Sequence, residues 1–373
     1  MRQEAQQKQR RRVKNGSGAT ISDVSREAGV STATVSRILN NPEQVSPKTK
    51  AVVQSAIEKL GYRPNTAAQS LAARRSYTIG VLVPSISNML YAIMLDAFKQ
   101  VIERANYDLM LSSFDYSIDN IRPRVEKFIQ RGVDAVFIAS VEPDPAVAAI
   151  LANRDIPFTT TWLADGTAQP RIVYDHLGAA IKPAQHLVEL GHRKFALFTG
   201  PRARNRRLRE RHDAIAGHLL TKGIAPGDIT TIEIPVYDLK HAREAFRNML
   251  AKGDKQTAVI ASNDIVAAGV ILECHARGLS VPEDISVTGF GDMDIAAHFF
   301  PPITTIRTPR ADVGTLAADY LVARLTGETP RSELLLDFEL IVRDTTGPVP
   351  TTKGGAEPAS TTSDRRLHRE GMR

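Results

Sequence analysis

The residues with the most informative chemistry lie in the stretch ISDVSREAGVSTATVSRILN, which runs from residue 21 to residue 40. At 100° per residue, a helix that follows Ser31 places Ala33 and Arg37 on the face opposite its apolar side chains. An arginine on such a face can donate two hydrogen bonds to guanine, and a small side chain or a methyl group can contact the methyl of thymine. These residue types at this spacing therefore suit the edges of base pairs in a DNA groove.

Sequence signals for helix ends predict three short helices that would position this face. Each follows a Ser or Thr that can cap its amino end, and the first and third end at a glycine. The capping residues are Thr20, Ser31 and Ser46, and the glycines are Gly29 and Gly61. Apolar side chains at helical spacing would form the core: Ile21, Val24, Ala28, Val35, Ile38, Leu39, Val52, Val53, Ala56, Ile57 and Leu60. Two helices joined at a glycine indicate a helix-turn-helix, whose second helix enters the major groove, although a plain helical bundle with a polar face is the alternative.

The distribution of charge favours the DNA-binding interpretation. Residues 1–76 contain 14 Lys and Arg against 5 Asp and Glu, an excess of +9, whereas the rest of the chain has a balance of −2. Contacts to phosphates supply most of the sequence-independent affinity of proteins for DNA, so a basic amino-terminal part suits this partner. The segment KQRRRVK at residues 8–14 can also be a solvated tail. The candidate DNA contacts of the helices are Thr20, Ser31, Thr32, Ala33, Thr34, Ser36, Arg37 and Asn40.

Most of the remaining chain alternates short β-branched runs with helical patterns, which predicts parallel sheets covered by helices on both faces. The strand candidates are YTIGVLVPS, YDLMLSSFD, VDAVFIAS, IPFTTTW, RIVYD, KFALFTG, DITTIEIP, TAVIASND and ISVTGFGD. So many strands divide naturally into two halves, and ligands of such sheets bind at the carboxyl ends of the strands, so we expect a cleft between the halves. Residues 1–19 and 346–373 lack apolar periodicity and are predicted to be disordered.

Five segments carry a recognisable pattern: TISDVSREAGVSTATVSRILNNPEQVSPKTKAVVQSAIEKLGYRPN, AAQSLAARRSYTIGVLVPSISN, GHRKFALFTGP, AVIASNDIVAAGVILECHARGLSVPEDISVTGFGD and PPITTIRTP. This pattern resembles the lactose-repressor (LacI/GalR) family of bacterial transcription regulators. The resemblance implies a helix-turn-helix headpiece at residues 20–63 and a periplasmic-binding-protein-like α/β body of two lobes with parallel sheets at residues 76–345, with crossings near residues 175 and 305. It also implies a homodimer that binds a palindromic operator as double-stranded DNA, controlled by a small-molecule effector in the cleft.

The family pattern makes residues 64–75 a hinge helix that folds on operator DNA. Leu71 matches the leucine that enters the minor groove, where an apolar wedge unstacks a base step and kinks the duplex. Gln69 stands where many relatives carry a basic residue, which removes a possible phosphate contact. From the residues alone, this segment can equally be a short linker with a buried leucine.

Carried over position by position, the family pattern also names eight effector contacts: Leu90, Tyr91, Trp162, Asp175, Arg204, Tyr237, Asp264 and Asp292. Trp162 replaces a residue that is commonly acidic or polar. Gly291 stands where sugar- and purine-binding relatives often carry an aspartate, for which Asp292 next door can substitute.

An aromatic wall of Tyr91, Trp162 and Tyr237, with Arg204 to pair with an anionic group, favours a carboxylated or planar effector over a neutral sugar. Each aromatic residue taken alone is more often part of a core. The basic run RARNRRLRER at residues 202–211 can be an anion site or a solvated face, and we favour the solvated face for all of its arginines except Arg204.

Other classes of protein fit the sequence less well. The chain lacks a phosphate-binding loop, a GxSxG elbow, an HExxH motif and His/Cys ligand spacing, so we expect no enzyme activity, cofactor or metal. The single cysteine, Cys274, excludes an intramolecular disulfide. A solute-binding protein of a transport system would need an export signal, and a DNA-architectural protein would not need the α/β body. No apolar run is long enough to span a membrane, and we expect a cytoplasmic protein.

Overall fold

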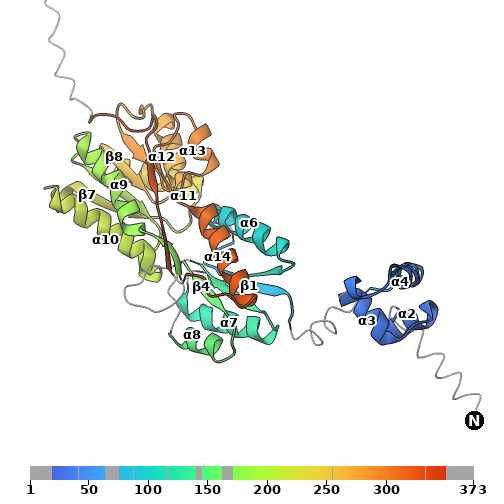
Figure 1. The fold of residues 1–373 in the computed structure, drawn as a ribbon. Helices are drawn as coiled ribbons and strands as arrows, with labels where there is room; N and C mark the ends of the chain where they lie inside the picture. Colours follow the sequence, from blue (N-terminus) through green and yellow to red (C-terminus); the bar gives the residue numbers. More distant parts are fainter. Residues whose placement is uncertain are drawn as a thin grey trace, which may run out of the picture. The chain divides into compact units, whose positions relative to one another are not determined.

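A computed structural model describes residues 19–40, 42–63, 75–86, 88–115, 117–139, 145–161, 171–253, 255–331 and 333–349 (Figure 1). The chain divides into two compact units, residues 1–77 and 78–373, each of which is considered by itself below. Several predictions fall outside the described residues: the arm up to residue 18, the hinge at residues 64–74 with Gln69 and Leu71, Trp162, and the tail from residue 350.

The first unit contains the three predicted helices, α2 (Ile21–Ala28), α3 (Thr32–Asn40) and α4 (Pro47–Leu60), with a short 3-10 helix, η1 (Pro42–Gln44), before α4. The helix ends follow the sequence signals: α2 has a complete capping box between Thr20 and Asp23, and Gly29 ends it in a left-handed conformation with a φ of 65°. Ser31 and Ser46 cap the next two helices through the backbone N–H groups of Thr34 and Thr49.

The core of this unit is small and confirms most of the predicted apolar positions. Val24, Val35 and Val53 are fully buried, and all the other predicted residues except Val52 pack around them. The prediction for Val52 is wrong, because 45% of its surface is exposed. Val53, Ala56, Ile57 and Leu60 already fill the face of α4 that meets the other helices, and Val52 lies beyond the edge of this stripe.

The first lobe of the second unit is built on a parallel sheet with the strand order β11-β5-β4-β3-β1-β2. The strands are β1 (Thr78–Val83), β2 (Asp108–Ser113), β3 (Ala135–Ile138), β4 (Phe158–Thr160), β5 (Arg171–Tyr174) and β11 (Glu333–Leu336). Helices α6 (Met89–Arg104) and α14 (Arg310–Leu325) cover one face, and η2 (Ile118–Asn120), α7 (Ile121–Gln130) and α8 (Pro145–Ala152) lie on the other side (Figure 1). Strands covered on both faces are continuously apolar, as in TIGVLV of β1.

The second lobe repeats this arrangement around a parallel sheet with the order β7-β6-β8-β9. Its strands are β6 (Phe195–Thr199), β7 (Ile229–Glu233), β8 (Ala258–Ala261) and β9 (Ser286–Thr288). Helices α9 (His176–Glu189) and α10 (Arg206–Thr221) cover one face, and α11 (Leu239–Ala251) and α12 (Asp264–Ala276) cover the other (Figure 1). The lobe also includes η3 (Arg202–Arg204), η4 (Pro226–Asp228), α13 (Asp294–His298) and the antiparallel pair of β10 (Thr305–Arg307) and β12 (Glu339–Ile341).

The chain passes between the lobes at Asp175, at residues 308–309 and, through β11 and β12, at residues 337–338. The third passage and strands β10, β11 and β12 were not predicted. The start of the tail also differs from the prediction, because residues 346–349 pack on the second lobe. The backbone N–H of Gly347 donates to Ser286 Oγ at 3.1 Å, and that of Val349 donates to the Leu190 carbonyl at 3.0 Å.

Helices α6 and α14 approach each other closely beside the passage between the lobes. A Cβ atom added at Gly314 would fall on the carbonyl oxygen of Met94, so only glycine allows this approach. The amino-terminal turns of both helices are thereby held where the carboxyl ends of the strands meet the second lobe. In the part of the chain that the structure describes, no helix is long and apolar enough to cross a membrane.

Candidate functional site

The first candidate site is the outer face of α3. Thr32, Ala33 and Arg37 are exposed, whereas Val35 and Ile38 on the opposite side are buried in the core of the headpiece. Thr34 and Ser36 are half-buried and flank the exposed face. This is the arrangement that the helical spacing predicts, and it leaves the guanidinium of Arg37 accessible to a partner.

Two of the predicted DNA contacts have a structural task as well. Thr20 Oγ1 accepts a hydrogen bond from the backbone N–H of Asp23 at 3.3 Å, and Ser31 Oγ accepts one from that of Thr34 at 3.1 Å. These hydroxyls therefore fix the amino ends of α2 and α3 whether or not DNA is bound. The side chain of Asn40 lies outside the described part of the chain.

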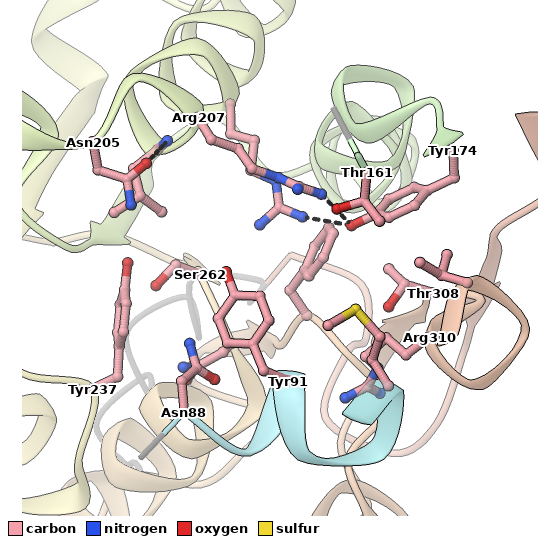
Figure 2. A pocket seen from close by; sticks show the side chains of 16 residues that line it. Asn88, Tyr91, Thr161, Tyr174, Asn205, Arg207, Tyr237, Ser262, Thr308 and Arg310 are labelled. Atoms are coloured by element: carbon pink, nitrogen blue, oxygen red, sulfur yellow. Dashed lines mark hydrogen bonds between the residues drawn. The ribbon is translucent and has the colours of Figure 1, made fainter. Parts of the chain in front are cut away.

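The second candidate site is a cavity between the lobes, at the carboxyl ends of the strands (Figure 2). It has a volume of about 90 Å³. Both lobes and the passages between them contribute lining residues: Asn88, Tyr91, Met94, Thr161, Tyr174, Asn205, Arg207, Leu208, Arg211, Tyr237, Ser262, Asn263, Phe290, Thr308, Arg310 and Val313. A wider entrance adjoins the cavity and shares Asn88, Asn205, Leu208, Tyr237 and Asn263 with it.

Helix α10 presents two arginines to the cavity. The side chain of Asn205 caps this helix through the backbone N–H of Leu208, at 3.2 Å, and the four-residue spacing of Arg207 and Arg211 puts both on one face. Both guanidinium groups donate to Tyr174 Oη at the end of β5, at 2.8 Å and 3.3 Å (Figure 2). The guanidinium of Arg211 also stacks on the ring of Phe290, 3.7 Å from its centroid.

A third arginine, Arg310, enters the cavity from the first turn of α14 (Figure 2). No Asp or Glu is found among the lining residues that the structure describes. The electrostatic effect is visible in neighbouring groups. Burial by itself would raise the pKa of Tyr174, but the charges of Arg207, Arg211 and Arg310 outweigh burial and lower it. Burial, together with the charges of Arg207 and Arg211, lowers the pKa of His176 to about 2, so this imidazole is neutral.

Of the eight effector contacts that the family pattern names, the structure brings Tyr91 and Tyr237 together at the cavity (Figure 2). Tyr237 Oη accepts a hydrogen bond from the backbone N–H of Gly200 at 3.0 Å, and burial raises its pKa to about 12. Leu90 lies in α6 and Arg204 in η3, but their side chains are outside the described part, as is all of Trp162.

The three predicted carboxylates line neither the cavity nor its entrance. Asp175 caps α9 through the N–H groups of Leu177 and Gly178. The buried Asp264 accepts hydrogen bonds from the N–H of Met293 at 2.7 Å and from Thr305 Oγ1 at 2.5 Å. Asp292 forms ion pairs with Arg307 and Arg343, both at 2.7 Å.

Several residues that line the cavity were not predicted from the sequence. Arg207 and Arg211 were assigned to a solvated face, and the structure contradicts this assignment because both line the cavity. Their helical spacing was the available signal, but the sequence does not show which face of α10 turns inward. Tyr174 and Arg310 adjoin passages between the lobes, and no local pattern marks either of them as a ligand contact.

A helix-turn-helix with an exposed polar face, joined to a two-lobed body with a cavity at its strand ends, defines a DNA-binding protein with a ligand-binding body. Comparisons with known proteins give the family. Residues 20–65 match the family "Bacterial regulatory proteins, lacI family", and residues 184–346 match "Periplasmic binding protein-like domain". The chain belongs to the lacI family of bacterial transcription regulators, as the sequence resemblance predicts.

Individual relatives extend the likeness over most of the chain. Catabolite control protein A of Priestia megaterium is 30% identical over 317 residues, which cover 85% of this chain and 95% of that protein. The ribose operon repressor of Escherichia coli (strain K12) is 30% identical over 321 residues, or 85% and 96% of the two chains. The crystal structure of the lac repressor dimer bound to operator and the anti-inducer ONPF has a TM-score of 0.78 and 28% identity, and the match covers 89% of this chain and all of that one. The chain is therefore a DNA-binding regulator with an effector domain, and not an enzyme.

Proposed function

We propose that this regulator acts in the cytoplasm as a homodimer on a two-fold symmetric operator, and that a small molecule in the cavity between the lobes changes its affinity for that operator. The observation that carries the DNA-binding part is the face of α3, where Ala33 and Arg37 are exposed opposite the buried Val35 and Ile38. Helix-turn-helix proteins place such a face in the major groove, and a dimer pairs it with two half-sites. The lac repressor in the related structure is a dimer bound to operator.

The position of the cavity supports control by a ligand. Residues of both lobes line it, with Tyr91 and Tyr174 on the first and Arg211 and Tyr237 on the second. A ligand that contacts both lobes favours one arrangement of the lobes over another. It can change the affinity for DNA by no more than the difference between its own affinities for these two arrangements.

Selection of bound sequences from random DNA tests the DNA-binding part. We expect a two-fold symmetric sequence with two half-sites, and recovery of no such symmetry would contradict the proposal. Arg37→Ala should lower operator affinity about 10- to 100-fold and relax the base preference at one position of each half-site, since one bidentate contact is worth about 1–3 kcal/mol.

A matched control is Arg26→Ala, which removes an exposed arginine from the end of α2. This variant should keep the base preference of the wild type, and any loss should be equal on all DNA sequences because only phosphate contacts are affected. The hinge stays a prediction: Leu71→Ala should weaken operator binding more than binding to other DNA, and equal losses would contradict a wedge.

A further inference from the structure

Three arginines meet in the cavity, and two of them, Arg211 and Arg310, have buried donors without a partner among the residues that the structure describes. Arg207 and Arg211 come from α10 of the second lobe, and Arg310 comes from α14 of the first. Nε of Arg211 and both Nε and Nη1 of Arg310 are buried and lack a hydrogen-bond partner among the residues that the structure describes. Burying a guanidinium with unused donors is costly, so these atoms indicate a place for an acceptor from outside the chain.

Among the residues that the structure describes, the groups near Arg211 and Arg310 do not satisfy these donors. Tyr174 Oη accepts hydrogen bonds from Arg207 and Arg211, but a phenol is neutral when protonated. The carboxylate of Asp264 acts on Arg310 only at a distance, and its two oxygens are taken by Thr305 and the N–H of Met293. Burial is the largest influence on both Arg211 and Arg310 and lowers the pKa of each below that of a free guanidinium.

The rest of the cavity indicates the shape of the missing partner. Tyr91, Met94 and Val313 give it an apolar wall. Phe290 stacks on the guanidinium plane of Arg211, so that Nε at the edge of this plane stays available to a ligand. Planar guanidinium groups recognise carboxylates and phosphates through paired hydrogen bonds.

We propose that the cavity takes a small organic anion, a carboxylate or a phosphate ester with a planar apolar portion, whose acidic group is bound by Arg211 and Arg310 next to Tyr174. This inference rests on the proposed control by a ligand in the same cavity and names the chemical class of that ligand. A neutral sugar would leave the charges of Arg211 and Arg310 uncompensated.

Calorimetric titration of the full chain at constant ionic strength tests the proposal with charged and neutral probes of similar shape. Benzoate is compared with benzamide, and phenyl phosphate with phenyl β-D-glucoside, and D-ribose serves as a neutral sugar. We expect saturable binding of at least one anion and none of its neutral counterpart. Binding of benzoate alone would assign a carboxylate, and binding of phenyl phosphate alone would assign a phosphate ester.

Substitutions of the cavity arginines show where the anion binds. Arg211→Gln and Arg310→Gln should each weaken anion binding on the order of 10- to 100-fold, the value of a charged hydrogen bond. Arg209→Gln is the matched control, because Arg209 lies on the same helix but is exposed and outside the cavity. It should bind the anion as the wild type does.

Three results would overturn the inference: neither anion binds at about 10 mM, where even millimolar affinity is measurable; a neutral probe binds as well as its anion; or both cavity variants bind as tightly as the wild type. The DNA selection described above separates this failure from failure of the proposed function. If a neutral sugar binds and alters operator affinity, the anion inference fails while the proposed function holds. If the anion binds and operator affinity does not change, the site is correct and ligand control fails.

Discussion

The protein contains two groups of three arginines, which differ in whether a carboxylate lies among them. Between α11 and α12, Arg243, Arg247 and Arg277 surround the carboxylate of Glu273, with N–O distances of 3.1, 2.9 and 3.1 Å. The side chain of Glu273 is only 3% exposed, whereas each of the three arginines keeps about 40–46% of its side chain exposed. In the cavity, the described lining residues include no carboxylate, and Arg211 and Arg310 have buried donors without a partner among the described residues.

The pKa values of the arginines in the two groups shift in opposite directions. Hydrogen bonding to Glu273 raises the pKa of Arg247, and hydrogen bonds from Arg247, with those from Arg277 and Arg243, lower the pKa of Glu273 to about 2. In the cavity, burial lowers the pKa of Arg211 and Arg310. Glu273 therefore supplies the anion for the arginines between α11 and α12, whereas no described residue of the cavity lining supplies a carboxylate to Arg211 and Arg310.

The largest effect on stability should come from removing the carboxylate of Glu273. Glu273→Gln should lower the free energy of unfolding by about 1–3 kcal/mol, because a buried carboxylate that accepts hydrogen bonds from three guanidinium groups is lost. Urea unfolding measures the change. The control Glu103→Gln, in an exposed pair with Lys99, should cost at most about 0.5 kcal/mol. Equal losses in the two variants would remove the distinction between a structural cluster and an ordinary surface pair.

Low pH should remove the contribution that ionised Glu273 makes to the free energy of unfolding. The pKa of Glu273 lies at about 2 in the folded protein, below its ordinary value of 4.5, so its pairing stabilises fully above pH 4.5 and loses that effect as the pH falls towards 2. The difference in unfolding free energy between wild type and Glu273→Gln should therefore narrow below pH 4.5. A difference that stays constant down to about pH 3 would show that the charge of Glu273 contributes nothing.

The smallest effect on stability should come from substituting an arginine of the cavity in the absence of ligand. Arg310→Gln should leave the free energy of unfolding within about 0.5 kcal/mol of the wild type or raise it by up to about 1 kcal/mol, because it removes a buried charge that lacks a partner. Thermal or urea unfolding without ligand measures it. A loss above about 2 kcal/mol would mean that the protein already compensates this guanidinium, and the comparison between the two groups would fail.

The headpiece was predictable because its signals are local. The capping box at Thr20, the left-handed Gly29 and the alternation of buried Val35 with exposed Ala33 and Arg37 each depend on residues a few positions apart. The nine predicted strands were found for the same reason, since each contains a local run of β-branched or other apolar residues. The pairing of β10, β11 and β12 depends on contacts between distant segments, which no local pattern reveals.

The cavity could be predicted only in part. Its place at the strand ends follows from the α/β pattern, and Tyr91 and Tyr237 follow from the family resemblance. The partners of Asp264 and Asp292 come from segments that the sequence separates, so their structural tasks could not be foreseen. The inward turn of Arg207 and Arg211 depends on how α10 packs against the sheet, and the position of Arg310 depends on the passage from β10 to α14.

The most direct measurement is a crystal structure of the full chain with whichever of 4-bromobenzoate and 4-bromophenyl phosphate binds more tightly, with the bromine located by its anomalous signal. We expect one bromine site against Tyr91 and Val313, with the acidic group about 3 Å from the guanidinium nitrogens of Arg211 and Arg310. A cavity without the anion, or an anion found instead at Arg243 and Arg247, would contradict the account.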